Sequence, residues 1–319
     1  MKKTYIPLLC TMLLIGGMVG AADVLRNNEI IFPEIAAIAT GALLTPKLAW
    51  RTDHLHTFWA ITVCAALGLG IVLFVPAALW LQMSIAYLLA SLLFMASGTS
   101  FAPMISAAVL PVLLQTRSVV YLIAACTLTA GILCVRRILV RNGVLTDTEF
   151  EKMPKPDKES IFQAVLRWLI AAAVIVAALH LNVRFAAAPP LLVAFTEFWK
   201  PEAVSRKRPV AVIALITLCA ASGAGVRFAF TERLAVPACV SAALTIAAVY
   251  SIMKKLGLML PPASAIAILA FLIPKEPLLI FPVQIMLGIS VFVGASYLYR
   301  EKPLRKMAVF RALFQHLVR

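Results

Sequence analysis

Charged side chains are scarce in this chain of 319 residues. Only 13% of the residues are charged and 62% are hydrophobic, whereas soluble domains are about a quarter charged and about half apolar. Apolar runs long enough to span a membrane recur from one end of the chain to the other. Segments with the alternating pattern of β-strands are absent, which argues against a β-barrel. The composition therefore predicts an all-α, polytopic transmembrane helical bundle embedded in a lipid bilayer.

Sequence patterns for metal, redox and hydrolytic chemistry are also missing. The six cysteines lie in apolar segments, and none forms a C-x-x-C pair with nearby histidines. No phosphate loop, hydrolase elbow, kinase signature or H-E-x-x-H motif occurs. An intramembrane enzyme of lipid chemistry would need ionisable groups clustered at one depth, and the sequence offers no such cluster. We therefore expect no metal, no cofactor and no enzymatic activity.

Acidic residues are fewer than basic ones, 14 against 29, which gives a formal net charge of +15. No basic stripe interleaved with aromatic residues is present, so we expect no nucleic-acid partner. The lysines and arginines instead lie in short loops beside apolar segments, where they set the orientation of membrane helices. Their distribution predicts a multi-pass protein of the plasma (inner) membrane, with both termini in the cytoplasm.

One phrase occurs twice, as T-V-C-A-A-L-G-L-G at 62–70 and as T-L-C-A-A-S-G-A-G at 217–225, an offset of 155 residues. Small residues are common at helix interfaces in membranes, so a single match of this kind is weak evidence. Further matches keep the same order in both halves, at an offset that rises from 155 to between 158 and 161 residues beyond the third segment: Arg51 with Arg206, Pro76 with Pro237, Pro103 with Pro261 and Ser106 with Ser264. The ordered series predicts two tandem repeats, with the repeated phrase as a helix-packing surface.

Each repeat contains about six apolar segments. They are 5–23, 32–46, 57–75, 77–97, 102–114 and 119–135, then 161–181, 187–199, 209–226, 235–253, 260–273 and 278–298. The predicted domains are a first repeat at 1–135, a cytoplasmic linker at 136–160, a second repeat at 161–299 and a basic tail at 300–319. Because 161–181 is a counterpart of 5–23, we expect the first segment to be retained rather than removed as a signal peptide. Six crossings make the repeats parallel, whereas one re-entrant segment per repeat would invert them.

The second and fifth segments of both repeats are short and interrupted by proline. Paired breaks of this kind indicate a transport site, because a broken helix exposes backbone groups that must be satisfied. The alternative is that the prolines only begin helices, where proline is well tolerated. The candidate solute-binding residues are Pro33, Glu34, Thr40, Pro103, Ser106, Pro189, Pro190, Thr196, Glu197, Pro261, Pro262 and Ser264.

Two acids and two arginines carry the charge near this candidate site. Glu34 and Glu197 lie at or within apolar segments, where an ionisable group suggests a functional role such as carrying a proton or holding a cation. The alternative is that each side chain reaches the membrane interface. Arg51 and Arg206 occupy equivalent positions at the inner mouth. They either draw an anion toward the site or anchor the loop on the cytoplasmic side.

The second half carries a family resemblance. It contains L-P-P-A-S-A-I-A-I-L at 260–269, preceded by W-K-P-E-A-V-S-R-K-R-P at 199–209. These stretches resemble the HPP family of integral membrane proteins, in which a His-Pro-Pro motif precedes small residues and follows a loop with proline and arginine. Leu260 stands where that family has histidine. The layout is also similar to the aromatic-acid exporter group, which uses six-helix units in pairs. Both resemblances imply carriage of small anions.

These observations predict a transporter, either a secondary carrier or channel-like. The expected solute is a small organic or inorganic anion, and the expected path runs between the two repeats. The rival prediction is a non-transporting membrane scaffold or assembly subunit, which would co-purify with another protein and lack a central polar cavity. The sequence leaves open a homodimer formed through lipid-facing helices.

Overall fold

The chain folds into helices throughout the part that can be described. The computed structural model describes residues 2–45, 47–147, 149–200 and 207–301, and no β-strand occurs among them. Eight helices in these ranges are long and apolar enough to cross a membrane. The predicted all-α class with several apolar membrane-length helices is therefore confirmed. Each of the twelve predicted apolar segments overlaps a helix.

The first half contains four long helices and two short ones. They are α1 (Lys2–Val24), α2 (Glu34–Ala39), α3 (His54–Phe74), α4 (Leu79–Ala96), α5 (Pro103–Leu114) and α6 (Val120–Arg141). A 3-10 turn, η1 (Asn28–Ile30), precedes α2, and a π-helix, η2 (Thr40–Leu44), continues it. Asp53 begins α3, because its side chain accepts a hydrogen bond from the backbone N–H of His56 at 2.7 Å.

The second half has the same alternation of long and short helices. They are α7 (Lys158–His180), α8 (Pro189–Trp199), α9 (Pro209–Val226), α10 (Ala238–Leu256), α11 (Pro261–Leu269) and α12 (Phe281–Glu301). A 3-10 turn, η3 (Arg184–Ala187), precedes α8, and a π-helix, η5 (Arg227–Arg233), continues α9. Proline begins α5, α8, α9 and α11, where its missing N–H has no partner to lose. The non-helical connection between the halves falls within the predicted linker.

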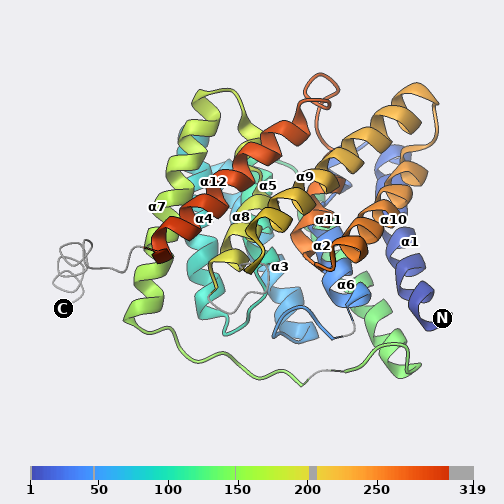
Figure 1. Cartoon of the computed structure of the whole chain (residues 1–319), viewed down its shortest axis with the longest axis horizontal. Helices are drawn as coiled ribbons and strands as arrows, with labels where there is room; N and C mark the ends of the chain where they lie inside the picture. The colour runs from blue at the N-terminus through green and yellow to red at the C-terminus, as the bar shows by residue number, and fades with distance from the viewer. Residues whose placement is uncertain (1, 46, 148, 201–206, 302–319) are drawn as a thin grey trace.

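The four short helices form the core of the molecule. Every residue of α2 and of α11 is buried, and so is every residue of α5 except Leu114 and of α8 except Glu197. The long helices surround them and expose large apolar side chains such as Trp59 and Phe74. Figure 1 shows α2, α5, α8 and α11 near the middle of the view, with α1 and α7 toward opposite sides. The segments with paired proline breaks thus lie in the interior of the described part of the chain.

Helices from the two halves pack against each other in matched pairs. Helix α1 packs against α10, and α7 packs against α4. In the centre, α2 packs against α11 and α8 packs against α5. Within each half, α3 packs against α5 in the same way that α9 packs against α11. Each of these pairs thus has a counterpart formed by the equivalent helices of the other half, if α7 is taken as the equivalent of α1 and so on to α12 and α6.

The repeated motif at 62–70 and 217–225 packs the third helix of each half against a short helix. A Cβ atom placed on Gly68 would lie 2.1 Å from the carbonyl oxygen of Ala108 in α5. A Cβ atom on Gly223 would lie 2.1 Å from the carbonyl oxygen of Ala267 in α11. Glycine is therefore required at both positions because backbone approaches backbone. The predicted packing role of the phrase is confirmed at these two glycines.

Candidate functional site

The four short helices meet at a narrow cavity. Each helix contributes two residues from its first turn, three positions apart, so that one face of each turn lines the space. The cavity is too narrow to admit a water molecule and is lined by Glu34, Ala37, Pro103, Ser106, Pro190, Val193, Pro262 and Ala265. Five of these eight residues were candidates in the sequence. The fold therefore brings the second and fifth segments of both halves to one place.

Glu34 is the carboxyl group of this cavity. Its Oε1 atom accepts a hydrogen bond from the Ser106 hydroxyl, and both residues are 1% exposed. Its Oε2 atom is buried and has no hydrogen-bond partner among the described residues. Glu34 is the first residue of α2, where the helix dipole favours a negative charge. One oxygen of the carboxyl group is thus held by α5 and the other is left to a proton or a ligand.

Hydroxyl groups join the short helices just beyond the cavity. The hydroxyls of Thr40 and Ser264 lie 2.7 Å apart, which links η2 to α11. Thr196 of α8 lies 3.1 Å from the Tyr87 hydroxyl of α4. All four side chains are buried, and each hydroxyl pair can donate in either direction. These contacts satisfy polar groups that would otherwise be stranded in an apolar core.

The predicted prolines divide into two groups. Pro103, Pro190 and Pro262 line the cavity. Pro33 is the residue before α2, while Pro189 and Pro261 begin α8 and α11. Pro103 belongs to both groups, because it also begins α5. The assignment of these prolines to a solute site stays a prediction.

Glu197 lies away from the cavity, at the C-terminal end of α8. Its Oε1 atom accepts a hydrogen bond from the indole N–H of Trp50 at 2.7 Å. The Trp50 ring packs edge-on against Phe101, with centroids 5.1 Å apart, and lies over Gly41, where an added Cβ would be 2.3 Å from the ring. This bond crosses between the two halves of the chain. Glu34 and Glu197 are thus parts of two separate polar sites.

Of the two arginines predicted at the inner mouth, the structure describes Arg51. Arg51 is exposed. Its backbone N–H donates a hydrogen bond to the Ser100 hydroxyl at 2.8 Å. Arg206 lies outside the described residues. The anion-drawing role and the anchoring role of these arginines both stay predictions.

Sequence reasoning missed two buried arginines and one half-buried lysine. Arg136 is 2% exposed and donates to the carbonyl oxygens of Ala42 in η2 and of Thr146 at 3.2 Å. Arg167 of α7 is 7% exposed. Lys200 follows α8 and lies half-buried beside Glu197. Both arginines could have been recognised from the sequence, because each lies inside an otherwise apolar helix. A guanidinium group at such a position costs free energy unless it has partners.

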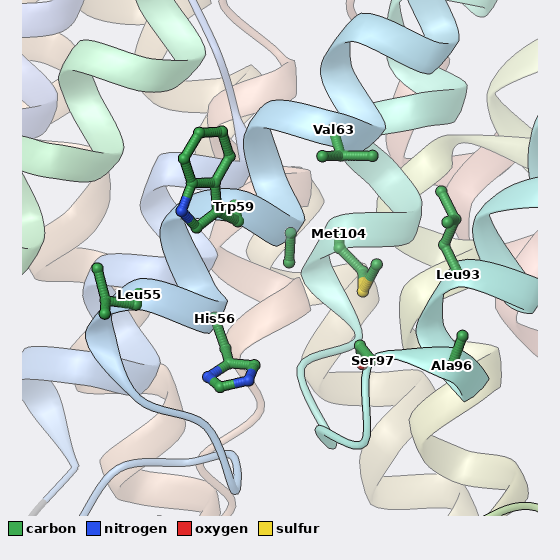
Figure 2. Close-up of a pocket in the computed structure, with 9 residues that line it drawn as sticks. Leu55, His56, Trp59, Val63, Leu93, Ala96, Ser97 and Met104 are labelled. Carbon is green, nitrogen blue, oxygen red and sulfur yellow. The ribbon is translucent and has the colours of Figure 1, made fainter.

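A second hollow opens between α3 and α4. It is an apolar groove of about 330 Å³ lined by Leu55, His56, Trp59, Ala60, Val63, Leu93, Ala96, Ser97 and Met104. Figure 2 shows Trp59 and Leu93 on opposite walls, Met104 between them and His56 at one end. The imidazole Nδ1 of His56 lies 2.9 Å from a carboxylate oxygen of Asp53. Met104 is the chain neighbour of Pro103, so the groove ends one residue from the Glu34 cavity.

No family model, no curated protein and no solved structure matches the chain. The described residues contain no group of three histidine, cysteine, aspartate or glutamate side chains placed to hold a metal ion. The polar groups at or near the short helices are one carboxyl oxygen of Glu34 without a partner among the described residues, several hydroxyls, and the cations Arg136 and Lys200.

Proposed function

We propose that the chain is a membrane transporter for a small organic or inorganic anion, with its path between the four short helices. The observation that supports this most directly is the buried Glu34 carboxyl, which has one oxygen without a partner in a cavity shared by α2, α5, α8 and α11. An ionisable group inside a membrane protein is expensive and marks a solute or proton pathway by default. A scaffold needs no such group at its centre.

A secondary carrier fits this cavity better than a permanently open channel. The space beside Glu34 is too narrow for water, so passage of a solute requires the short helices to move apart. When Glu34 is protonated, its free Oε2 side can donate a hydrogen bond to an anion; when it is ionised, it repels the anion. Proton binding and anion binding would then favour each other, which is the basis of proton-coupled transport.

We further propose that the chain is a parallel tandem repeat with both termini in the cytoplasm of an inner membrane. The pairings α1–α10, α2–α11 and α3–α5 recur six helices later as α7–α4, α8–α5 and α9–α11, which supports duplication. An offset of 159 residues relates Pro103 to Pro262 in the cavity lining, and the same offset relates Ala108 to Ala267 at the two glycine contacts. At this offset Ser106 corresponds to Ala265, so the polar pair with Glu34 belongs to the first half alone.

Flux through liposomes tests the proposal. Purified full-length protein is reconstituted and offered acetate, benzoate, nitrate and phosphate, with and without a pH gradient. We expect uptake of at least one anion, faster with a more acidic outside. Glu34→Gln should abolish the dependence on the gradient, whereas Glu151→Gln, a change at an exposed residue of the connection, should leave it intact.

Absence of flux for every anion in this panel would refute the transport proposal. A protein that co-purifies stably with the chain, together with that absence, would favour the scaffold or assembly subunit. The resemblance to the HPP family and to the aromatic-acid exporter group agrees with anion transport and stays a prediction.

A further inference from the structure

The groove between α3 and α4 opens on the outside of the helix bundle. Both helices are among those long and apolar enough to cross a membrane. Leu55 and Trp59 line the groove and are exposed, whereas Met104, which also lines it, is buried. Figure 2 shows Met104 between the walls that carry Trp59 and Leu93. The groove thus runs from the outer face of two membrane-length helices to the buried first turn of α5.

The polar side chains of the groove lie at one end. Seven of its nine lining residues are apolar, and the other two are His56, in the first turn of α3, and Ser97, directly after α4. Figure 2 shows both at the same end, away from Val63. The Nδ1 atom of His56 lies 2.9 Å from a carboxylate oxygen of Asp53, so Nε2 is the ring nitrogen left for a ligand. The groove therefore has the two parts of an amphiphile, an apolar length and a polar end.

A cation lies at this polar end. The Lys152 side chain packs against Gly98, because a Cβ atom on Gly98 would lie 2.6 Å from both its Cγ and its Cε atoms. The backbone N–H of Met153 donates to the carbonyl oxygen of Gly98 at 2.7 Å, and the Phe150 ring lies 4.8 Å from the His56 ring. The connection between the two halves thus crosses the end of the groove and brings an exposed lysine there.

The bilayer decides what fills the apolar part of the groove. Water gains little from an apolar wall, and an empty space forfeits the dispersion contacts of the side chains around it. Acyl chains are the apolar groups that surround membrane-length helices in the hydrocarbon layer. The volume of about 330 Å³ lies near the lower end of the range for small-molecule sites, about 300–1,000 Å³. It suits a length of one acyl chain rather than a whole lipid.

We propose that the groove holds one acyl chain of a bilayer phospholipid, whose phosphate lies at the polar end beside Lys152. An ammonium group binds phosphate as a compact charge, and a protonated His56 can donate to the same group through Nε2. Trp59 adds an amphipathic ring of the kind that is common where membrane helices meet the headgroup layer. The site lies outside the Glu34 cavity and requires no transport, so it goes beyond the proposed function.

Native mass spectrometry of the full-length protein in detergent tests the site. The protein is titrated separately with dioleoylphosphatidylglycerol, with dioleoylglycerol, which has the same chains without phosphate, and with glycerol 3-phosphate, which has the phosphate without chains. We expect saturable binding of one phosphatidylglycerol per chain, weaker binding of dioleoylglycerol and no binding of glycerol 3-phosphate.

Matched variants separate the contributions of the chain and the phosphate. Ala96→Phe fills the groove and should weaken phosphatidylglycerol binding about ten-fold or more, since each buried CH₂ group adds to the affinity. Ala66→Phe, at an exposed position of α3 outside the groove, should bind like the parent protein. Lys152→Gln should weaken binding about five-fold, as expected for one basic residue beside lipid headgroups. Lys155→Gln, at an exposed position of the same connection, should have no effect.

Equal binding by Ala96→Phe and the parent protein, or the lack of saturable phosphatidylglycerol binding, would overturn the site. Binding of glycerol 3-phosphate as tight as that of the lipid would also overturn it, because the acyl chain would then contribute nothing. A dimer that Ala96→Phe separates would overturn it too, since a second copy of the chain would then fill the groove. If Ala96→Phe does not yield a monodisperse protein, Lys152→Gln decides, and unchanged binding in that variant overturns the proposal.

Discussion

Ser106 of α5 donates its hydroxyl proton to the carboxyl oxygen Oε1 of Glu34, and so joins the two short helices of the first half at their first turns. Both side chains are 1% exposed. The hydrogen bond orients the carboxyl group and leaves its other oxygen, Oε2, directed to no partner among the described residues. The pair is therefore a structural contact that leaves one carboxyl oxygen available for the proton of the proposed transport.

Replacing Ser106 by alanine should destabilise the protein. The buried Glu34 carboxyl would lose its hydrogen bond, and an unsatisfied buried group costs about 1–3 kcal/mol. Thermal unfolding of the purified protein in detergent measures the effect as a lower melting temperature. Ser290→Ala is the matched control, because Ser290 is exposed and donates only to the carbonyl of its own helix at Met286. Equal melting of the two variants would mean that the Glu34 contact contributes no stability.

The paired glycines allow an internally controlled test of packing. Alanine at Gly68 or Gly223 would place a methyl group 2.1 Å from a backbone carbonyl oxygen of a short helix. The helices must separate, and overpacking of this kind costs about 1–3 kcal/mol or more. Gly70 and Gly225 have nothing within 4 Å of an added Cβ, so alanine there should be neutral or slightly stabilising. If all four variants melt alike, the close helix approach is not present in solution.

The sequence placed the short helices correctly for a physical reason. Proline cannot continue a helix but begins one well, so Pro103, Pro189 and Pro261 mark the starts of α5, α8 and α11. Glu34 was recognisable because a carboxyl group in an apolar run is rare and costly. Both features can be recognised from neighbouring residues in the sequence, so their identification does not require knowledge of the fold.

Register and cross-chain partners were not accessible in the same way. The double proline at 261–262 made two alignments equally good, and the cavity lining and the two glycine contacts distinguish Pro262 as the partner position of Pro103. Trp50 and Glu197 gave no sequence signal of their contact, because they lie in different halves of the chain and meet only when the halves pack. Charge burial is set by those long-range contacts rather than by neighbours in the chain.

The hydrogen bond from the Trp50 indole to Glu197 should contribute measurably to the free energy of unfolding. Trp50→Phe keeps a ring against Phe101 and removes the N–H that donates to the carboxylate at 2.7 Å. A hydrogen bond to a charged group contributes about 1.5–3 kcal/mol. Melting temperatures of Trp50→Phe, Glu197→Gln and the double variant form a cycle in which the two changes should not add. Trp59→Phe, at a residue that is 59% exposed, serves as the control. Additive effects in the cycle would show that the two side chains act independently.

Arg136 should prove essential to the break in the second segment. The helix that begins at Glu34 changes from α to π geometry at Thr40, which leaves carbonyl groups without their usual partners. Arg136 donates to one of them, on Ala42, and also to the carbonyl of Thr146 beyond α6. Arg136→Gln should therefore cost about 3 kcal/mol, since each bond from a charged donor contributes about 1.5–3 kcal/mol.

The adjacent Arg137 provides the control for this change, because its side chain is exposed on the same helix. Arg137→Gln should melt like the parent protein, within the roughly ±0.5 kcal/mol typical of surface substitutions. The destabilisation of η2 in Arg136→Gln should also disturb the Glu34 cavity, because η2 continues the helix that Glu34 begins. Anion flux in liposomes should then fall together with the melting temperature. A variant that melts at a lower temperature but transports normally would separate the π-helix from the transport path.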